Sequence, residues 1–130
     1  MDQIAVVQSP PSAVQLSRVI SSIVQRGRFD LSDEKRTQTQ LADALTAAGL
    51  PFAREHALSE GDVVDFLVAG ILAVELKIKG SKKAIFRQLE RYAGHDCVHA
   101  ILLVSALAIP LPATIKGKPA ATASLAFGWL

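Results

Sequence analysis

The amino-acid sequence predicts an α/β domain in which helices flank a mixed β-sheet. The first observation is the alternation of two patterns: segments with apolar residues at helical spacing, and short runs rich in Val, Ile and Leu that are typical of buried strands. The second is their order, helices first, then three strands, a helix and two more strands. With 130 residues, half of them hydrophobic and a fifth charged, the chain fits one globular domain.

The N-terminal part is expected to begin with a leader and a helix. Residues 1–11 are predicted to form a flexible leader that ends at two prolines, and residues 12–130 to form the domain. Apolar residues at helical spacing predict a helix over residues 12–25, and Gly27 ends it.

A second helix follows and carries acids at its start. Ser32 is expected to cap it, with Asp33 and Glu34 in its first turn and Gly49 as its stop. Its inner stripe is expected to be Leu41, Ala44, Leu45 and Ala48. An acid in a first turn is favoured by the helix dipole wherever it points, so Glu34 has a structural explanation from its position alone.

Residues 62–79 read as a hairpin of two buried strands. A two-residue turn would place Asp65 and Glu75 on opposite faces. A three-residue loop over residues 68–70 pairs Asp65 with Ala73, so that Asp65 and Glu75 share a face as diagonal neighbours, about 7–8 Å apart at the backbone. We favour the longer loop because the opposite face then consists of apolar residues throughout: Val64, Phe66, Val68, Leu72, Val74, Leu76 and Ile78.

Five further segments complete the predicted sheet and its cover. Residues 52–58 are expected to form a strand before the hairpin, and residues 82–93 a helix after it. Residues 98–104 are apolar at nearly every position, which predicts a central strand. Residues 109–122, rich in Pro, Ala and Gly, are expected to be a mobile loop, and residues 123–129 to close the sheet.

Three charged residues stand in the apolar hairpin and need an explanation. Charges in a buried strand cost several kcal/mol each unless they are paired. Asp65, Glu75 and Lys77 would lie on one face of the hairpin. A buried ion pair between the lysine and one acid would be a structural explanation, and a metal site would be a functional one.

The hairpin resembles the signature of the PD-(D/E)XK nuclease superfamily. Asp65, a short gap and then Glu75-Leu76-Lys77 are similar to its paired acids and lysine. Val64 stands where the pattern has proline, so the motif is incomplete at that position. The resemblance implies a restriction-endonuclease-like fold with an αβββαβ core.

The resemblance extends over roughly residues 31–105. Members of the superfamily often carry a glutamate on a helix before the hairpin, and Glu34 occupies such a place. The helix after the hairpin carries Gln88-x-x-x-Tyr92, which is similar to the QxxxY motif of the RecB-like branch. Residues four apart lie on one side of a helix, so both side chains could reach the site.

The family likeness implies hydrolysis of DNA phosphodiester bonds with Mg²⁺, for which Mn²⁺ can substitute. Hard oxygen ligands suit these ions, so Asp65, Glu75 and the backbone carbonyl of Leu76 are the expected metal ligands. Lys77 is expected to orient the attacking water or to stabilise the phosphate. Glu34 is expected to hold a second metal or a metal-bound water.

The expected substrate is DNA, and an endonuclease or junction resolvase is favoured over an exonuclease. Gln88 is expected to hold DNA or a metal-bound water. Residues 77–91 contain six positive side chains and one negative, and the expected DNA contacts are Lys79, Lys82, Lys83, Arg87 and Tyr92. A homodimer is possible, as in resolvases of this size.

The composition constrains the setting and leaves alternatives open. The single cysteine, Cys97, excludes an internal disulfide and fits a reducing cytoplasm. No secretory signal or membrane span is expected, and the net charge of +2 is too small to imply nucleic acid by itself. One alternative is a catalytically inactive nuclease-like module for DNA binding or assembly. Another, a domain for a phosphorylated small molecule, lacks a glycine-rich loop to support it.

Overall fold

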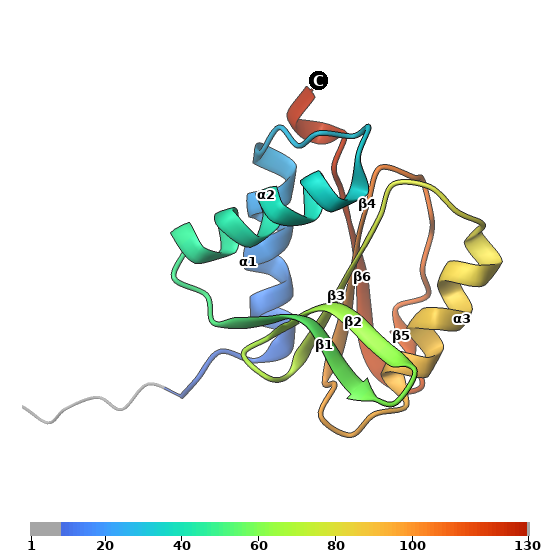
Figure 1. Ribbon diagram of the computed structural model, residues 1–130. Coiled ribbons are helices and arrows are strands. Elements are labelled where there is room, and N and C mark those ends of the chain that lie inside the picture. The colour runs from blue at the N-terminus through green and yellow to red at the C-terminus, as the bar shows by residue number, and fades with distance from the viewer. Residues whose placement is uncertain (1–8, 130) are drawn as a thin grey trace, which may run out of the picture.

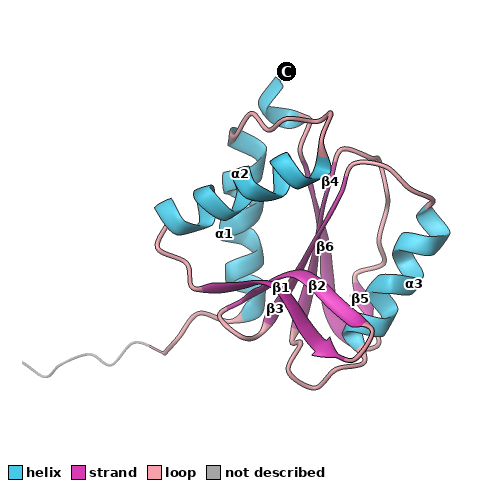
Figure 2. Ribbon diagram, in the orientation of Figure 1, coloured by secondary structure: helices cyan, strands magenta, loops and turns pink. Residues whose placement is uncertain are grey.

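The computed structural model describes residues 9–129, and most of the predicted leader lies outside them. The chain forms a six-stranded mixed sheet with helices on both faces (Figures 1 and 2). The strand order is β1-β2-β3-β4-β6-β5. The strands are β1 (Phe52–Ser59), β2 (Asp62–Val68), β3 (Leu72–Lys77), β4 (Ala100–Ser105), β5 (Thr114–Ile115) and β6 (Lys118–Ser124). The helices are α1 (Ala13–Arg26), α2 (Glu34–Ala47), α3 (Lys82–Ala93) and a 3₁₀ turn, η1 (Phe127–Trp129).

The first helix is capped by Ser12 and begins one residue later than predicted. The Ser12 hydroxyl accepts a hydrogen bond from the Gln15 N–H at 3.1 Å, and the Gln15 side chain accepts one from the Ser12 N–H at 2.8 Å. This reciprocal pair satisfies two of the free N–H groups at the helix start. The predicted helix over residues 12–25 is present, with its bounds shifted by one residue to 13–26.

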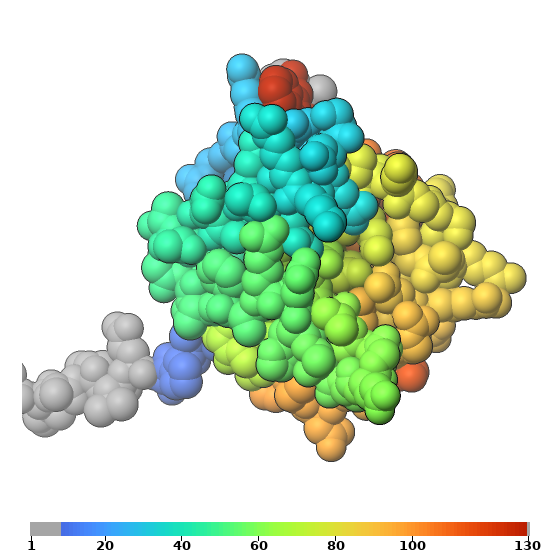
Figure 3. Space-filling view, in the orientation of Figure 1, coloured from blue at the N-terminus to red at the C-terminus, as the bar shows by residue number. Residues whose placement is uncertain are grey.

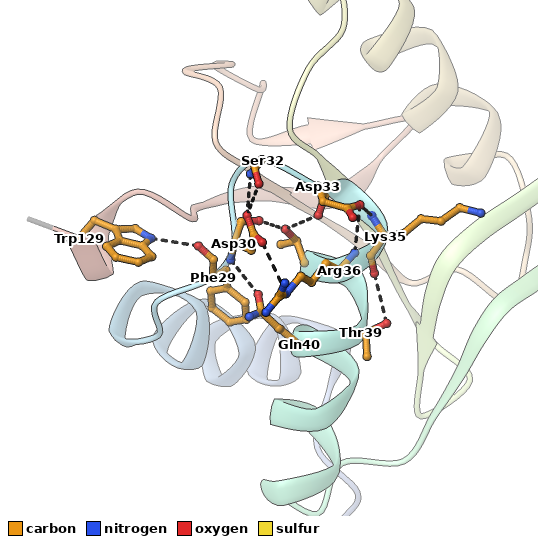
Figure 4. A network of polar contacts seen from close by, with 10 residues as sticks. Phe29, Asp30, Ser32, Asp33, Lys35, Arg36, Thr39, Gln40 and Trp129 are labelled. Carbon is orange, nitrogen blue, oxygen red and sulfur yellow. Dashed lines mark hydrogen bonds and ion pairs between the residues drawn. The ribbon is translucent and has the colours of Figure 1, made fainter.

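The second helix begins one residue later than predicted. Asp33 is the cap, and its carboxylate accepts from the Lys35 N–H at 3.1 Å. Ser32 is bound instead to Asp30, which accepts from both its N–H and its hydroxyl (Figure 4). A carboxylate two residues away thus competes for the serine and leaves the cap to Asp33. Glu34 becomes the first helical residue.

The loop between β2 and β3 has three residues, as expected, but covers residues 69–71. Val68 pairs with Leu72, and the predicted register is therefore wrong by two residues. Ala69 and Gly70 both adopt positive φ, which closes the loop one residue further along. Because a shift of two preserves the face of each side chain, the expectation that Asp65 and Glu75 share a face is confirmed.

Two cores lie on the two faces of the sheet. The larger one, under α1 and α2, contains five of the seven predicted apolar hairpin residues, and Ile78 packs against it. Val64 is the exception, because it lies in the smaller core under α3. Glu55 lies on β1 opposite Asp65. It has a φ of 49° and is not paired with β2, so β1 is distorted next to Val64.

The C-terminal part differs most from the sequence-based prediction. β4 is buried throughout and pairs in parallel with β3 and β6, as expected for a central strand. Residues 109–122 are not a loop, because they include the β5–β6 hairpin with a tight turn at Lys116 and Gly117, both at positive φ. The closing strand ends at Ser124, so only the first two residues of the predicted strand over 123–129 belong to it.

Candidate active site

The predicted site lies where β2 and β3 separate. Their backbone pairing covers Phe66 to Val68 and goes no further towards the start of β2. Beyond it, the Asp65 N–H donates to Glu75 Oε1 at 3.1 Å, and the Leu76 N–H donates to Asp65 Oδ2 at 2.8 Å. Each carboxylate thus accepts a hydrogen bond from a backbone N–H of the facing strand. The two acids are held face to face in the opening between the strands.

Burial makes the ionised form of this acid pair costly. Glu75 is 2% exposed, and Asp65 is half-buried. Burial raises the pKa of both carboxyls, and the charge of Asp65 adds to the effect on Glu75, whose pKa rises to about 8. At neutral pH the pair therefore keeps a proton unless another positive charge is present.

Lys77 lowers the pKa of Glu75 without cancelling the effect of burial. Its Nζ lies 3.5 Å from Glu75 Oε2, and its side chain is 24% exposed. One ammonium thus stands beside two carboxylates at the edge of the buried region. The same contact would be present if Lys77 and Glu75 formed only a structural, buried ion pair.

The α3 helix reaches the acids through Tyr92. The Tyr92 hydroxyl is hydrogen-bonded to the Val63 carbonyl at 2.8 Å and lies 3.2 Å from Glu75 Oε2. The Gln88 amide donates to the same hydroxyl at 2.8 Å. Tyr92 is 1% exposed, which corrects its assignment as a DNA contact. Burial raises its pKa, so the phenol stays protonated and can donate.

Glu34 lies within electrostatic reach of the site. Burial raises the pKa of its carboxyl, the charge of Lys77 lowers it, and the charge of Asp65 raises it. A hollow of about 370 Å³ is lined by Glu34 and Lys79 among others, where the start of α2 meets the loop after β3 (Figure 3). Gln38, one turn further, is directed elsewhere and accepts two hydrogen bonds from Arg54.

A basic groove adjoins Lys77. It has a volume of about 390 Å³ and runs from the end of β3 along α3 as far as its last turn. Its charged lining residues are Lys77, Lys79, Arg87 and Arg91, and Gln88 lies among them. The other two predicted DNA contacts, Lys82 and Lys83, are exposed at the start of α3 but do not line the groove.

One charged cluster was not predicted from the sequence. Asp62 Oδ1 lies 3.1 Å from Arg91 Nε, and its Oδ2 lies 2.9 Å from His95 Nε2. The hydrogen bond with His95 and the contact with Arg91 lower the pKa of Asp62. These partners are 29 and 33 residues from Asp62 along the chain, so no local pattern indicated the cluster. It neutralises one of the groove's arginines.

The donor groups at the strand opening fit a hard divalent cation. No group of three or more His, Cys, Asp or Glu side chains suited to a metal occurs within residues 9–129. Mg²⁺, however, keeps several of its waters and needs only one or two carboxylates. Asp65 and Glu75 provide these. The N–H and C=O of one residue leave a strand on the same side, so the Leu76 carbonyl is directed, like its N–H, towards Asp65.

No family model matches this chain, and neither a curated protein nor a solved structure is similar to it at a significant level. No helix within residues 9–129 is long and apolar enough to cross a membrane. The inference of function therefore depends on the geometry around Asp65, Glu75 and Lys77.

Proposed function

We propose that this protein is a metal-dependent nuclease of the PD-(D/E)XK type that hydrolyses phosphodiester bonds in DNA. The observation that carries the proposal is the contact of two acids, Asp65 and Glu75, in the opening between β2 and β3, with Lys77 Nζ 3.5 Å from Glu75. Burial raises the pKa of both acids, and the charge of Asp65 raises that of Glu75 further. Such perturbed acids are typical of active sites.

When both carboxyls are ionised, Lys77 leaves one negative charge without a partner, and a bound cation would balance it in place of the proton that the pair otherwise keeps. Lys77 can neutralise one carboxylate, and its contact is with Glu75. Asp65, also raised in pKa by burial, has no lysine or arginine within ion-pair distance among residues 9–129. A buried acid without a positive partner is destabilising. A divalent cation at the pair would remove that cost.

The arrangement of elements supports the nuclease type. An antiparallel set of three strands, β1 to β3, is followed by α3 and by β4 in parallel with β3. This is the order of the αβββαβ core that the motif implies. Glu34 on the preceding helix and the Gln88–Tyr92 pair on α3 approach the same acids.

The side chains have distinct roles in the proposed reaction. Bound Mg²⁺ would be held by Asp65, Glu75 and the Leu76 carbonyl, and would supply positive charge and a water of lowered pKa. Lys77 donates to the attacking water or to the phosphate. The Tyr92 hydroxyl and the backbone N–H of Asp65 fix the orientation of Glu75. The basic groove binds the phosphates on either side of the cleaved bond.

Cleavage of a panel of substrates tests the proposal. Linear duplex, single strand, closed circular plasmid and a four-way junction are incubated with Mg²⁺, Mn²⁺ or EDTA. We expect the wild type to cut at least one substrate with metal only, and Glu75→Gln and Lys77→Met to lose at least a hundredfold in rate. The exposed residues Glu60 and Lys35 provide the matched controls Glu60→Gln and Lys35→Met. Binding of DNA without cleavage under any condition would instead support an inactive DNA-binding module.

A further inference from the structure

A second cavity lies beside the proposed active site, at the C-terminal ends of β4 and β6. It has a volume of about 520 Å³ and is lined by residues 105–110, 122–124 and 126. Pockets of about 300–1,000 Å³ are of the size that holds small ligands. Its walls are mainly Ala, Leu, Ile and Pro, and three hydroxyls, of Ser105, Thr122 and Ser124, are its side-chain polar groups. None of the lining residues is charged.

The cavity is joined directly to Lys77. The Ser105 hydroxyl donates to the Lys77 carbonyl at 2.7 Å, and the Ala106 N–H donates to the same carbonyl at 3.2 Å. The loops that follow β3 and β4 accordingly lie side by side at one end of the sheet (Figure 1). Lys77 pairs with Ser105 in register, and Ser105 with Ser124. Neighbouring strands are about 4.8 Å apart, so the cavity begins within about 10 Å of the backbone of Lys77.

The cavity and the acid pair open on the same face of the sheet. Residues in register on parallel strands point to the same side, and Glu75, Leu103 and Thr122 are in register. Glu75 contacts Tyr92 of α3, and Leu103 lies in the core beneath that helix. Ser105 and Ser124, two residues further, therefore point to the face that carries Lys77.

The basic groove and the neighbouring cavity differ in chemistry, as do the phosphates and the bases of a nucleic-acid strand. The groove on the α3 side of Lys77 is basic and suits phosphate. The cavity has no positive charge, so a phosphate would lose its hydration there without compensation. A neutral, flat ring fits it, because Leu107, Ile109 and Pro110 offer apolar contacts and the hydroxyls of Thr122 and Ser124 can bond to its edge. Bases of a duplex are stacked inside the helix and cannot enter such a pocket unless they are unpaired.

We propose that this cavity holds an unpaired nucleobase of the strand whose phosphate lies at Lys77. The substrate is then DNA that is single-stranded at the point of cleavage: a single strand, a flap or an unpaired junction. This inference rests on the proposed function and specifies its substrate class.

Fluorescence anisotropy in EDTA tests the inference with three probes: a labelled single strand, the same strand in a duplex, and the strand with abasic sites at its centre. Ala108→Trp fills the cavity from an exposed lining position, and Ala108→Leu fills it less and serves if the tryptophan variant does not fold. Ala113→Trp is the matched control, because Ala113 is exposed in the same connection but does not line the cavity.

We expect the wild type to bind the single strand about tenfold more tightly than the duplex or the abasic strand, the low end of what stacking of a base contributes. Ala108→Trp should lose this preference and Ala113→Trp should keep it. Equal binding of all three probes, binding of none, or an unchanged preference in Ala108→Trp would overturn the inference. Metal-dependent cleavage measured on the same probes separates the two proposals. Cutting without a single-strand preference overturns only the cavity assignment, and a preference lost in Ala108→Trp without cutting overturns only the nuclease.

Discussion

The hydroxyl of Tyr92 lies 3.2 Å from Oε2 of Glu75 and links α3 to the acid pair between β2 and β3. The same hydroxyl is bonded to the Val63 carbonyl and receives a hydrogen bond from Gln88. A helix on one face of the sheet thereby sets the position of a carboxylate on a strand beneath it.

Removal of this hydroxyl should affect both stability and activity. In Tyr92→Phe the ring still fills the core, but the hydrogen bonds of the hydroxyl with the Val63 carbonyl and Glu75 are lost, which costs about 1 kcal/mol. We expect a lower urea midpoint and a cleavage rate reduced about tenfold at saturating DNA, because Glu75 is less well oriented. Gln88→Leu should lower the rate in the same direction but less. A Tyr92→Phe variant with the wild-type rate would show that the hydroxyl is only structural.

The stability of the metal-free protein should fall as the pH rises. Burial raises the pKa of Glu75 to about 8, whereas the unfolded value is 4.5. The folded state thus binds the proton more tightly, so its stabilisation is complete below about pH 4.5 and is lost as the pH rises through 8. Urea unfolding in EDTA from about pH 5 to about pH 9, a range set by roughly these two limits, measures the change in stability. Glu75→Gln, which cannot ionise, should flatten the dependence, and an equally steep dependence in this variant would contradict the account.

Variants of the observed cap, Asp33, and of the predicted cap, Ser32, test where α2 begins. Asp33→Ala removes the acceptor for the N–H groups of Lys35 and Arg36 and should cost about 1 kcal/mol. Ser32→Ala loses only the exposed hydrogen bond from its hydroxyl to Asp30 and should cost less. Chemical denaturation of the two variants measures the difference. A larger loss for Ser32→Ala would show that the serine is the cap.

Asp62 should weaken the binding of DNA by neutralising Arg91. The two side chains form an ion pair at 3.1 Å, and Arg91 lines the basic groove. Asp62→Asn keeps the shape but leaves the arginine unneutralised, so affinity should rise several-fold and depend more steeply on salt. Binding of a labelled oligonucleotide at several salt concentrations measures both, with Asp43→Asn on α2 as the control. Unchanged affinity in Asp62→Asn would exclude Arg91 from the phosphate contacts.

The sequence predicts well the elements whose signal is local. The cap of α1 depends on Ser12 and Gln15, three residues apart, and the burial of β4 follows from a continuous apolar run. The sequence predicts β6 poorly, because Ala120, Ala121 and Ala123 carry little strand preference and the strand is fixed by pairing with β4.

The same distinction applies to the candidate site. The alternation of side chains correctly placed Asp65 and Glu75 on one face. Their direct contact follows from a loop with two left-handed residues, of which Gly70 is a type that indicates this conformation and Ala69 is not. The contact between Tyr92 and Glu75 joins residues 17 apart on different elements. The sequence motif indicated the order of the two residues but not the hydrogen bond between them. The pairing of Asp62 with His95 had no local signal at all.

Binding of Mn²⁺ at neutral pH, followed by electron paramagnetic resonance, tests the central claim most directly. We expect one site in the wild type, and its loss in a double variant carrying Asp65→Asn and Glu75→Gln. The control variant Glu60→Gln should bind as the wild type does. No bound Mn²⁺ in the wild type, or equal binding in the double variant, would contradict a metal at the acid pair and leave the Glu75–Lys77 contact as a structural ion pair.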